Sequence, residues 1–240
     1  MQVVVPVKSF NNAKKRLATV LTAPQRAELM KHMLDDVLTA IVATAEVEGI
    51  TVVTSDEEVA QWVGKRAQRI KIPLRVFDPG LSPVNVLAEA GLCHAYSTAA
   101  ADLVSRGAST MLLLPADIPL VTKADIHALL AQHACPGVSM AAAGSDGGTN
   151  ALLVSPPNII APAFGENSCQ RHSAHAREQG VEPAVLNSAG LNLDIDTLED
   201  IQALLAADRE CATLRYLLDS GIAGELQQSG LQNQNNRQVG

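Results

Sequence analysis

Asp117 is a candidate ligand for a metal ion. It follows the apolar run Thr110–Pro115 and stands between Pro115 and Pro119, so a buried strand would end in a carboxylate on a rigid loop. A carboxylate at a sheet edge suits a Mg²⁺ ion that keeps several waters and bridges substrate phosphates. The alternative is that Asp117 only forms a turn.

Asp194 and Asp196 offer two further carboxylates in an alternating pattern. Leu191–Ile195 is predicted to be a strand whose apolar side chains face the core. Asp194 and Asp196 would then lie together on the opposite face. With a rise of ~3.3 Å per residue they would stand about 7 Å apart, and a cation would relieve their repulsion. The alternative for Asp196 is that it caps the next helix.

Four cations follow the first apolar run, Gln2–Val7. They lie within nine residues of one another and are Lys8, Lys14, Lys15 and Arg16. Ligands of open α/β sheets lie at the carboxyl ends of strands, where such side chains can neutralise phosphates. The loop contains no glycine, so it holds neither a dinucleotide-binding fingerprint nor a P-loop. A solvated charged turn is the alternative.

Two segments of the second half could bind an anion. Asp146–Asn150 contains a Gly-Gly pair that either lets the backbone approach a ligand or forms a tight turn. Gly165–His172 supplies a glycine, Ser168 as the expected helix cap, and a basic pair. The free N–H groups of a helix start attract phosphate or carboxylate. His172 and His175 are either catalytic or, as is more common for histidines on a helix, surface residues that are neither ligand nor base.

The composition excludes several classes of function. Acidic residues outnumber basic ones, 25 to 18, and no basic tract offers the charge that a nucleic-acid binder needs. The four cysteines are widely spaced, which fits neither a disulfide framework nor a zinc site. No apolar run approaches the ~20 residues of a membrane span, and the first residues do not form a signal peptide. We therefore expect a cytoplasmic protein whose partners are neither nucleic acid nor a membrane.

The elements that would position these groups alternate between strands and helices, which predicts an α/β fold. Helices are expected to begin at Thr22, at Ser82, at Thr122 and at Asp196-Thr197, each with a start signal. With hydrophobic residues at 47% and aromatic ones at 2%, the core must consist of Val, Leu, Ile and Ala, as in parallel sheets covered by helices. The expected strands are Gln2–Val7, Ile50–Thr54, Leu74–Phe77, Thr110–Pro115, Val138–Ala142, Asn150–Val154 and Leu191–Ile195.

The chain is expected to form one domain over residues 1–224. No internal repeat and no linker rich in Pro, Gly or Ser interrupts this part. Residues 225–240 are rich in Gln and Asn and poor in apolar side chains, so they are expected to form a disordered polar tail.

Five motifs occur in an order that resembles one enzyme family. They are VPVK with AKKRL, LLLPADIPL, DGGTNALLV, FGENSCQRH and LDIDTLEDI, and they span residues 1 to about 220. In this order they closely resemble the 2-phospho-L-lactate guanylyltransferase family of coenzyme F420 biosynthesis, with its phosphoenolpyruvate- and 3-phosphoglycerate-using relatives. No single motif is specific, since PADxPL also occurs in other nucleotidyltransferases, but the five together are.

The resemblance implies a nucleotidyltransferase fold, a Rossmann-like α/β/α sandwich with a mixed, mostly parallel sheet. It implies a Mg²⁺-dependent reaction in which GTP and a phosphorylated three-carbon acid yield pyrophosphate and a guanylylated acid. The expected partners are these two substrates, a second copy of the chain in a homodimer, and the next transferase of the pathway, which would receive the product.

The resemblance also assigns roles to individual residues. The expected metal ligands are Asp117 and one or both of Asp194 and Asp196. The expected catalytic groups are Lys8, Lys14, Arg16 and Asp117. The expected nucleotide contacts are Pro6, Val7, Lys8, Asn85, Pro115 and Ala116. The expected contacts to the acid are Thr149, Gly165, Ser168 and Arg171. Asn85 follows Pro83-Val84 where family members tend to have Gly-Leu, which leaves the guanosine contact open there.

Three other interpretations remain open. A sugar-nucleotide glycosyltransferase would use Asp194-Ile195-Asp196 as its metal site, although that motif is expected nearer the middle of the chain. Another Mg²⁺-dependent nucleotidyltransferase, of the cytidylyl or molybdopterin type, is a closer rival, but cytidylyltransferases usually carry a glycine-rich first loop. A non-catalytic nucleotide-binding protein would have no need of the three carboxylates.

Overall fold

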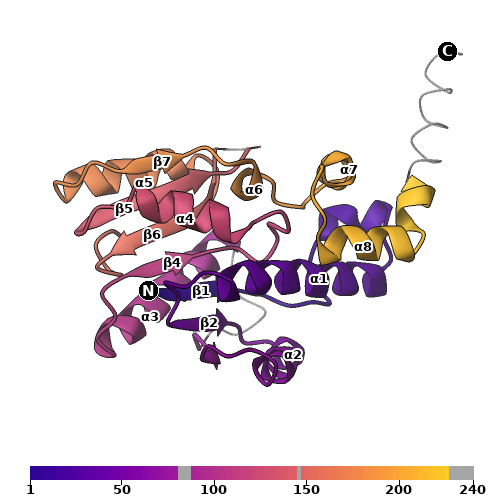
Figure 1. Cartoon of the computed structure of the whole chain (residues 1–240), viewed down its shortest axis with the longest axis horizontal. Coiled ribbons are helices and arrows are strands. Elements are labelled where there is room, and N and C mark those ends of the chain that lie inside the picture. The colour runs from indigo at the N-terminus through magenta and orange to yellow at the C-terminus, as the bar shows by residue number, and fades with distance from the viewer. Residues whose placement is uncertain (81–87, 145–146, 227–240) are drawn as a thin grey trace, which may run out of the picture.

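The computed structural model describes residues 1–80, 88–144 and 147–226. These residues form a seven-stranded sheet with helices on both faces, which confirms the expected α/β sandwich (Figure 1). The strands are β1 (Gln2–Pro6), β2 (Gly49–Val53), β3 (Leu74–Phe77), β4 (Met111–Leu113), β5 (Gly137–Ala142), β6 (Thr149–Ser155) and β7 (Ala184–Leu186). The helices are the 3-10 helix η1 (Lys15–Thr19), α1 (Ala23–Val42), α2 (Glu57–Ala67), α3 (Ala88–Ser105), α4 (Lys123–Ala131), α5 (Ser168–Glu178), α6 (Ala189–Asn192), α7 (Leu198–Ala206) and α8 (Ala212–Asp219).

The sheet is mixed and mostly parallel, as expected. Its strand order is β3-β2-β1-β4-β6-β5-β7. β1 pairs in parallel with β2 and β4, β2 with β3, and β5 with β7, whereas β6 runs antiparallel to both of its neighbours. Since β6 is reversed, its first residues, Thr149 and Asn150, lie at the edge of the sheet where β1 and β4 end.

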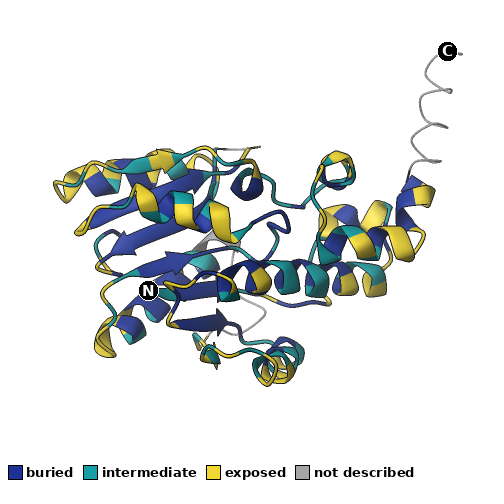
Figure 2. Cartoon of the chain, in the orientation of Figure 1, coloured by how far each residue is buried: buried dark blue, intermediate teal, exposed yellow. Residues whose placement is uncertain are grey.

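The sheet separates two apolar layers. Val3 and Val5 of β1 enter the larger layer, beneath α1 and α4, and Val4 enters the smaller one, beneath α3 and α5. Both layers consist largely of aliphatic side chains. In Figure 2 the central strands are dark blue and the outer faces of the helices yellow, so these strands are buried on both sides, whereas the edge strands β3 and β7 are partly exposed.

Three helices begin with a threonine that forms a capping box. Thr22 pairs with Gln25 at the start of α1, Thr122 with Asp125 at α4, and Thr197 with Asp200 at α7. In each, the threonine side chain accepts from the backbone N–H three residues on, and the partner side chain accepts in return. The starts expected at Thr22 and Thr122 are confirmed. The start expected at Ser82 lies outside the described residues.

The strand expected over Leu191–Ile195 is wrong. The chain forms α6 up to Asn192 and then a short extended connection, and the seventh strand is β7. Leu191 and Ile195 are both fully buried as expected, but residues four apart share a face in a helix as well as in a strand, so five residues cannot separate the two periods. β7 escaped prediction because it is only three residues long and its central Val185 is 52% exposed.

The last described residues pack on α1. The Asp36 carboxylate accepts from the backbone N–H groups of Ala212 and Thr213 at the start of α8. Leu226, which the sequence analysis places in the polar tail, is buried in the larger layer. In the described part of the chain, no helix is both long and apolar enough to cross a membrane.

Candidate active site

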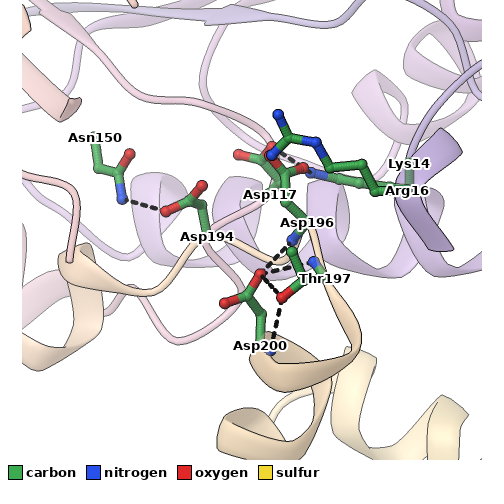
Figure 3. A network of polar contacts seen from close by, with 8 residues as sticks. All are labelled: Lys14, Arg16, Asp117, Asn150, Asp194, Asp196, Thr197 and Asp200. Atoms are coloured by element: carbon green, nitrogen blue, oxygen red, sulfur yellow. Dashed lines mark hydrogen bonds and ion pairs between the residues drawn. The ribbon is translucent and has the colours of Figure 1, made fainter. Parts of the chain in front are cut away.

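The ammonium of Lys14 lies between two carboxylates beyond the ends of β1 and β4 (Figure 3). Its Nζ atom donates to Oδ2 of Asp117 at 2.6 Å and to Oδ1 of Asp196 at 2.7 Å. The Lys14 side chain is only 5% exposed, and those of Asp117 and Asp196 are 26% and 41% exposed. This arrangement brings together one cation and two acids that the sequence analysis assigned to the site.

Backbone geometry explains why these residues meet. β1 and β4 are paired in parallel, so the segments that follow them leave the same edge of the sheet. The N–H of Ile195 donates to the carbonyl of Asp117 at 3.0 Å, which holds the segment with Asp194 and Asp196 against the end of β4. Lys14 itself has a left-handed backbone, with φ 52° and ψ 45°, which costs a non-glycine residue ~1–2 kcal/mol. The two ion pairs offset this strain.

Asp194 completes the acidic group without a cation of its own. In the described residues its side-chain partner is Asn150, whose Nδ2 donates to Oδ1 of Asp194 at 3.2 Å. Burial raises the pKa of Asp194, the Asn150 hydrogen bond lowers it, and the charges of Asp117 and Asp196 raise it further, with a net upward shift. Asp194 is therefore a carboxylate that lacks counter-charge.

Lys14 and Asp196 show the opposite balance. Burial alone would lower the pKa of Lys14, but the charges of Asp117 and Asp196 outweigh it and raise that pKa. Burial alone would raise the pKa of Asp196, but Lys14, with a smaller effect of Arg16, lowers it. Both residues are thus ionised at neutral pH. Asp196 does not cap α7, because Thr197 and Asp200 do so.

The carboxylates suit a hard cation in charge and donor type, although they do not surround one. Carboxylate oxygens are preferred ligands of Mg²⁺, and Asp194 lacks counter-charge. No three acidic, histidine or cysteine side chains of the described residues are grouped so that they could hold an ion as they stand. Lys14 already lies between Asp117 and Asp196, so a metal ion bound by all three acids would require Lys14 to release at least one of them.

A second polar group lies beside the acidic one, where β6 meets α5. Thr149 Oγ1 lies 3.0 Å from Ser168 Oγ and 3.0 Å from His172 Nδ1. The Nε2 atom of His172 accepts from the backbone N–H of Ala163 at 2.9 Å. Phe164 packs edge-on against the imidazole at 4.9 Å between ring centroids. The structure therefore brings Thr149 and Ser168 together as expected, but His172 is fully buried rather than on the surface.

Ser168 is not the cap of α5. Asn167 precedes the helix with a left-handed backbone, and Ser168 is its first residue. The N–H groups of Ser168 and Cys169 donate to the carbonyls of Gly165 and Gly147, so they are not free for an anion. Gly147 and Gly165 have φ values of +68° and +111°, which favour glycine, and for the Gly-Gly pair this supports the turn interpretation.

The remaining assigned residues lie around these two groups. Lys8 is exposed and has no ion pair among the described residues, and Arg16 is exposed with Nη1 3.9 Å from Asp196 Oδ2. Arg171 is exposed and donates from Nη2 to the Phe164 carbonyl at 3.0 Å. The assigned nucleotide contacts differ in access: Val7 and Ala116 are buried in the core, and Pro6 and Pro115 are half-buried. Asn85 lies outside the described residues.

The sequence analysis did not identify two residues of the site, Asn150 and His172. The sequence analysis places Asn150 at the end of the Asp146–Asn150 segment and at the start of a strand but gives its side chain no role, whereas in the structure it donates to Asp194 (Figure 3). Its position directly after Gly-Gly-Thr at a strand start was the available signal. His172 was set aside because a helix in isolation does not reveal which of its faces is covered.

The sequence is similar to guanylyltransferases over most of its length. A family profile described as "Guanylyl transferase CofC like" matches residues 1–238. The chain is 36% identical to the phosphoenolpyruvate guanylyltransferase of Sphaerobacter thermophilus, over 84% of this chain and 90% of that protein. It is 31% identical to the 2-phospho-L-lactate guanylyltransferase of Methanothermobacter thermautotrophicus, over 89% and 88%. It is also 31% identical to the 3-phospho-D-glycerate guanylyltransferase of Phenylobacterium zucineum, over 83% and 87%.

The fold is similar to that of solved nucleotide-dependent transferases. A crystal structure from Desulfovibrio desulfuricans G20, provisionally assigned as a nucleotide-diphospho-sugar transferase, superposes with a TM-score of 0.70. The match covers 95% of this chain and 96% of that one at 18% identity. At that identity the similarity concerns the fold alone.

Replacing Lys14 by Met tests whether its ammonium holds the acidic group together. We expect the free energy of unfolding at pH 7 to fall by ~3 kcal/mol, below the highest values for buried pairs because Asp196 is partly exposed. Lys8→Met, at an exposed unpaired lysine, is the control and should change little. Denaturant unfolding measures both, and equal stability of Lys14→Met and the wild type would contradict the interpretation.

The same comparison has a defined pH dependence. The lowered pKa of Asp196 means that its ion pair stabilises the fold above the ordinary value of 3.8 and is lost as the pH falls through the lower folded value. The raised pKa of Lys14 means that its contribution is present below 10.5 and is lost as the pH rises further. The difference between Lys14→Met and the wild type should therefore shrink toward pH 3.

His172 should make stability depend on pH in mildly acidic solution. Its pKa is lowered from 6.5 to about 4, first by burial and then by the charges of His175 and Arg171, so the unfolded chain binds this proton more readily. The contribution of neutral His172 to the free energy of unfolding is fully present above pH 6.5. It is lost as the pH falls from 6.5 through 4, which lowers the free energy of unfolding by ~3 kcal/mol. Unfolding measured between pH 7.5 and 4 should show this slope in the wild type and in His175→Asn, but a weaker one in His172→Asn.

Proposed function

The chain belongs to the CofC-like guanylyl transferase family, and on that premise we propose that it joins GMP from GTP to a phosphorylated three-carbon acid with release of pyrophosphate. The observation that carries the proposal is the acidic group of Asp117, Asp194 and Asp196 around Lys14, at the edge of the sheet where ligands of such folds bind. Guanylyltransferase relatives align over most of the chain, which favours this activity over a sugar transferase of similar fold.

The chemistry requires no general base from the protein. The nucleophile is a phosphate monoester whose second pKa is near ~6, so it is largely ionised at neutral pH. What the protein must supply is the approach of two anions and stabilisation of the charge that develops on the leaving pyrophosphate. Neither a serine-histidine pair nor an activated cysteine is needed for this.

The cations of the β1–η1 segment would meet the nucleotide phosphates. Lys14 is already held at the strand edge. Lys8, which follows β1, and Arg16, whose guanidinium has only a long contact of 3.9 Å with Asp196, are exposed and would turn toward a bound triphosphate. A buried ammonium in a weakly solvated place stabilises transferred negative charge more strongly than an exposed one. We therefore assign the main electrostatic role to Lys14 and accessory roles to Arg16 and Lys8.

Mg²⁺ would be held by Asp117, Asp194 and Asp196. Bound there, it would neutralise phosphate oxygens and orient the triphosphate. The chain's own contribution is to bring three carboxylates to one place, with Lys14 as the cation that Asp117 and Asp196 share in the absence of the metal ion. Mg²⁺ should accordingly raise the melting temperature of the wild type, which can be measured without substrates.

The acid would bind at Thr149 and Arg171. Ser168 and Gly165 would support this place from within, because the buried Ser168 hydroxyl contacts Thr149 and the Ser168 N–H donates to the Gly165 carbonyl. The two hydroxyl groups adjoin the acidic group through Asn150, the residue after Thr149, and the Arg171 guanidinium is exposed nearby on α5. Hydroxyl and guanidinium donors suit the phosphate and carboxylate that 2-phospho-L-lactate, phosphoenolpyruvate and 3-phospho-D-glycerate share. The choice among the three acids depends on their carbon skeletons, and we assign the class rather than one member.

Asp117→Asn should lower turnover at least ~10²-fold and keep the fold, because it removes one electrostatic element of the site without changing its shape. Asp219→Asn, at an exposed residue of α8, is the matched control and should retain full activity. Pyrophosphate release measures turnover, and circular dichroism checks the fold. Near-normal activity of a folded Asp117→Asn variant would refute the assignment of this site.

The substrate class is tested by incubating the protein with GTP, Mg²⁺ and each of the three acids separately. We expect pyrophosphate and a product of the mass of the guanylylated acid with at least one of them. ATP and CTP in place of GTP test the base. The absence of pyrophosphate release with all three acids would overturn the proposed function. Activity on a sugar phosphate in the same assay would point to a sugar-nucleotide transferase instead.

A further inference from the structure

His172 is neutral and its proton is on one identifiable nitrogen. The backbone N–H of Ala163 can only donate, so the Nε2 atom that it contacts at 2.9 Å carries no proton. Burial and the nearby charges of His175 and Arg171 lower the pKa of His172 to about 4, so the neutral ring keeps its single proton on Nδ1. Nδ1 therefore donates to Thr149 Oγ1, 3.0 Å away.

The direction of the hydrogen bond between His172 and Thr149 decides how many hydroxyl protons of Thr149 and Ser168 remain for a ligand. The hydrogen bond between Thr149 and Ser168, 3.0 Å long, uses one of their two hydroxyl protons. If Nδ1 of His172 were an acceptor, it would take the other one. Because Nδ1 donates, one hydroxyl proton is left without an acceptor among the described residues.

Burial decides which hydroxyl carries that proton. Ser168 is only 1% exposed, whereas Thr149 is half-buried at the sheet edge. A free proton on Ser168 would be buried without a partner, which is costly, so Ser168 donates to Thr149 and the free proton is on Thr149. Thr149 then accepts two hydrogen bonds, and its own proton has no acceptor among the described residues. Acceptance of both hydrogen bonds polarises its O–H group.

Thr149 lies at the same edge of the sheet as the acidic group. Asn150, the next residue of β6, donates to Asp194, whereas the Thr149 hydroxyl contacts α5, as expected for successive strand residues whose side chains leave opposite faces. Both residues begin β6 at the edge where the nucleotide phosphates would be held. The acid must bring its phosphate to the same place to attack them. A hydroxyl that is turned outward there is positioned to meet an oxygen of the acid.

We propose that His172 is a positioning residue: with Ser168 it makes Thr149 a double acceptor and so turns the Thr149 hydroxyl proton toward a phosphate or carboxylate oxygen of the acid. The inference rests on the proposed function for the identity of that acid. Ala163 fixes the tautomer and Phe164 packs against the ring, so the orientation is built into the fold before any ligand binds.

Two near-isosteric variants separate the two nitrogens of His172. The amide nitrogen of His172→Asn takes the position of Nδ1 and can still donate to Thr149. The amide oxygen of His172→Gln takes the position of Nε2 and keeps the Ala163 contact, but the donor to Thr149 is lost. We expect His172→Gln to raise the KM for the acid ~10-fold, the scale of one hydrogen bond to a charged group, and His172→Asn to stay near the wild type. The KM for GTP should stay constant in both.

A double-mutant cycle tests the route through Thr149. Thr149→Val removes the donor while keeping the shape, so His172→Gln should add nothing to the KM for the acid in that background. His175→Gln, one turn along α5 with its Nδ1 on the Ala161 carbonyl, is the control and should leave the KM unchanged. Equal KM values for His172→Gln and His172→Asn, or additive effects of His172→Gln and Thr149→Val, would overturn the inference and leave His172 a purely structural role.

Direct binding separates this inference from the proposed function. Phosphoenolpyruvate, 2-phospho-L-lactate and 3-phospho-D-glycerate are titrated into the wild type and the variants by calorimetry, with inorganic phosphate as the reference. Binding without turnover would refute guanylyl transfer, and the same order of variants in Kd would still support the role of His172. Wild type that neither binds nor turns over any of the three acids would overturn both.

Discussion

The ion pairs of Lys14 with Asp117 and Asp196 are the interaction on which the rest of the site depends. They join residues that are 103 and 182 positions apart in the sequence. Each partner comes from a different connection: the segment after β1, the loop after β4, and the extended segment between α6 and α7. Without a cation at this point, three carboxylates would face one another in a partly buried place, and the segments that carry them would separate.

This constraint explains local features that would otherwise be unfavourable. A lysine with a left-handed backbone and a buried ammonium would each be costly alone, but together they aim Nζ at both acids. Asp196 is available to pair with Lys14 because it is not needed as a helix cap. Thr197 and Asp200 form the capping box of α7. The reversed strand β6 then brings Thr149 and Asn150 to the same edge, so two polar groups of different kinds adjoin within two residues.

The sequence predicted those parts of the fold and site that rest on local signals. Capping boxes at Thr22 and Thr122 and six of the seven strands were found within one or two residues, because each is encoded by neighbouring side chains. The carboxylate of Asp117 was recognised from its prolines. The prediction failed at Leu191–Ile195, where five residues fit two periods, and at His172, whose burial depends on contacts with β6 and with Phe164 outside its own helix. Contacts of this second kind are decided by tertiary packing, which a helix pattern does not contain.

The charge balance of the site suits a protein that must bind two anions. One buried ammonium against three carboxylates leaves Asp194 without counter-charge, so the free protein has a place for additional positive charge. A bound triphosphate, in contrast, is negatively charged and requires cations to neutralise it. Asp117, Asp194 and Asp196 would hold a divalent ion that supplies this charge, and the Lys14 ammonium, which pairs with two of these acids in the free protein, would then be available to stabilise the leaving pyrophosphate. A lysine serves this purpose better than an arginine, because its compact charge on a flexible stem can change partners without the fixed geometry of a planar fork.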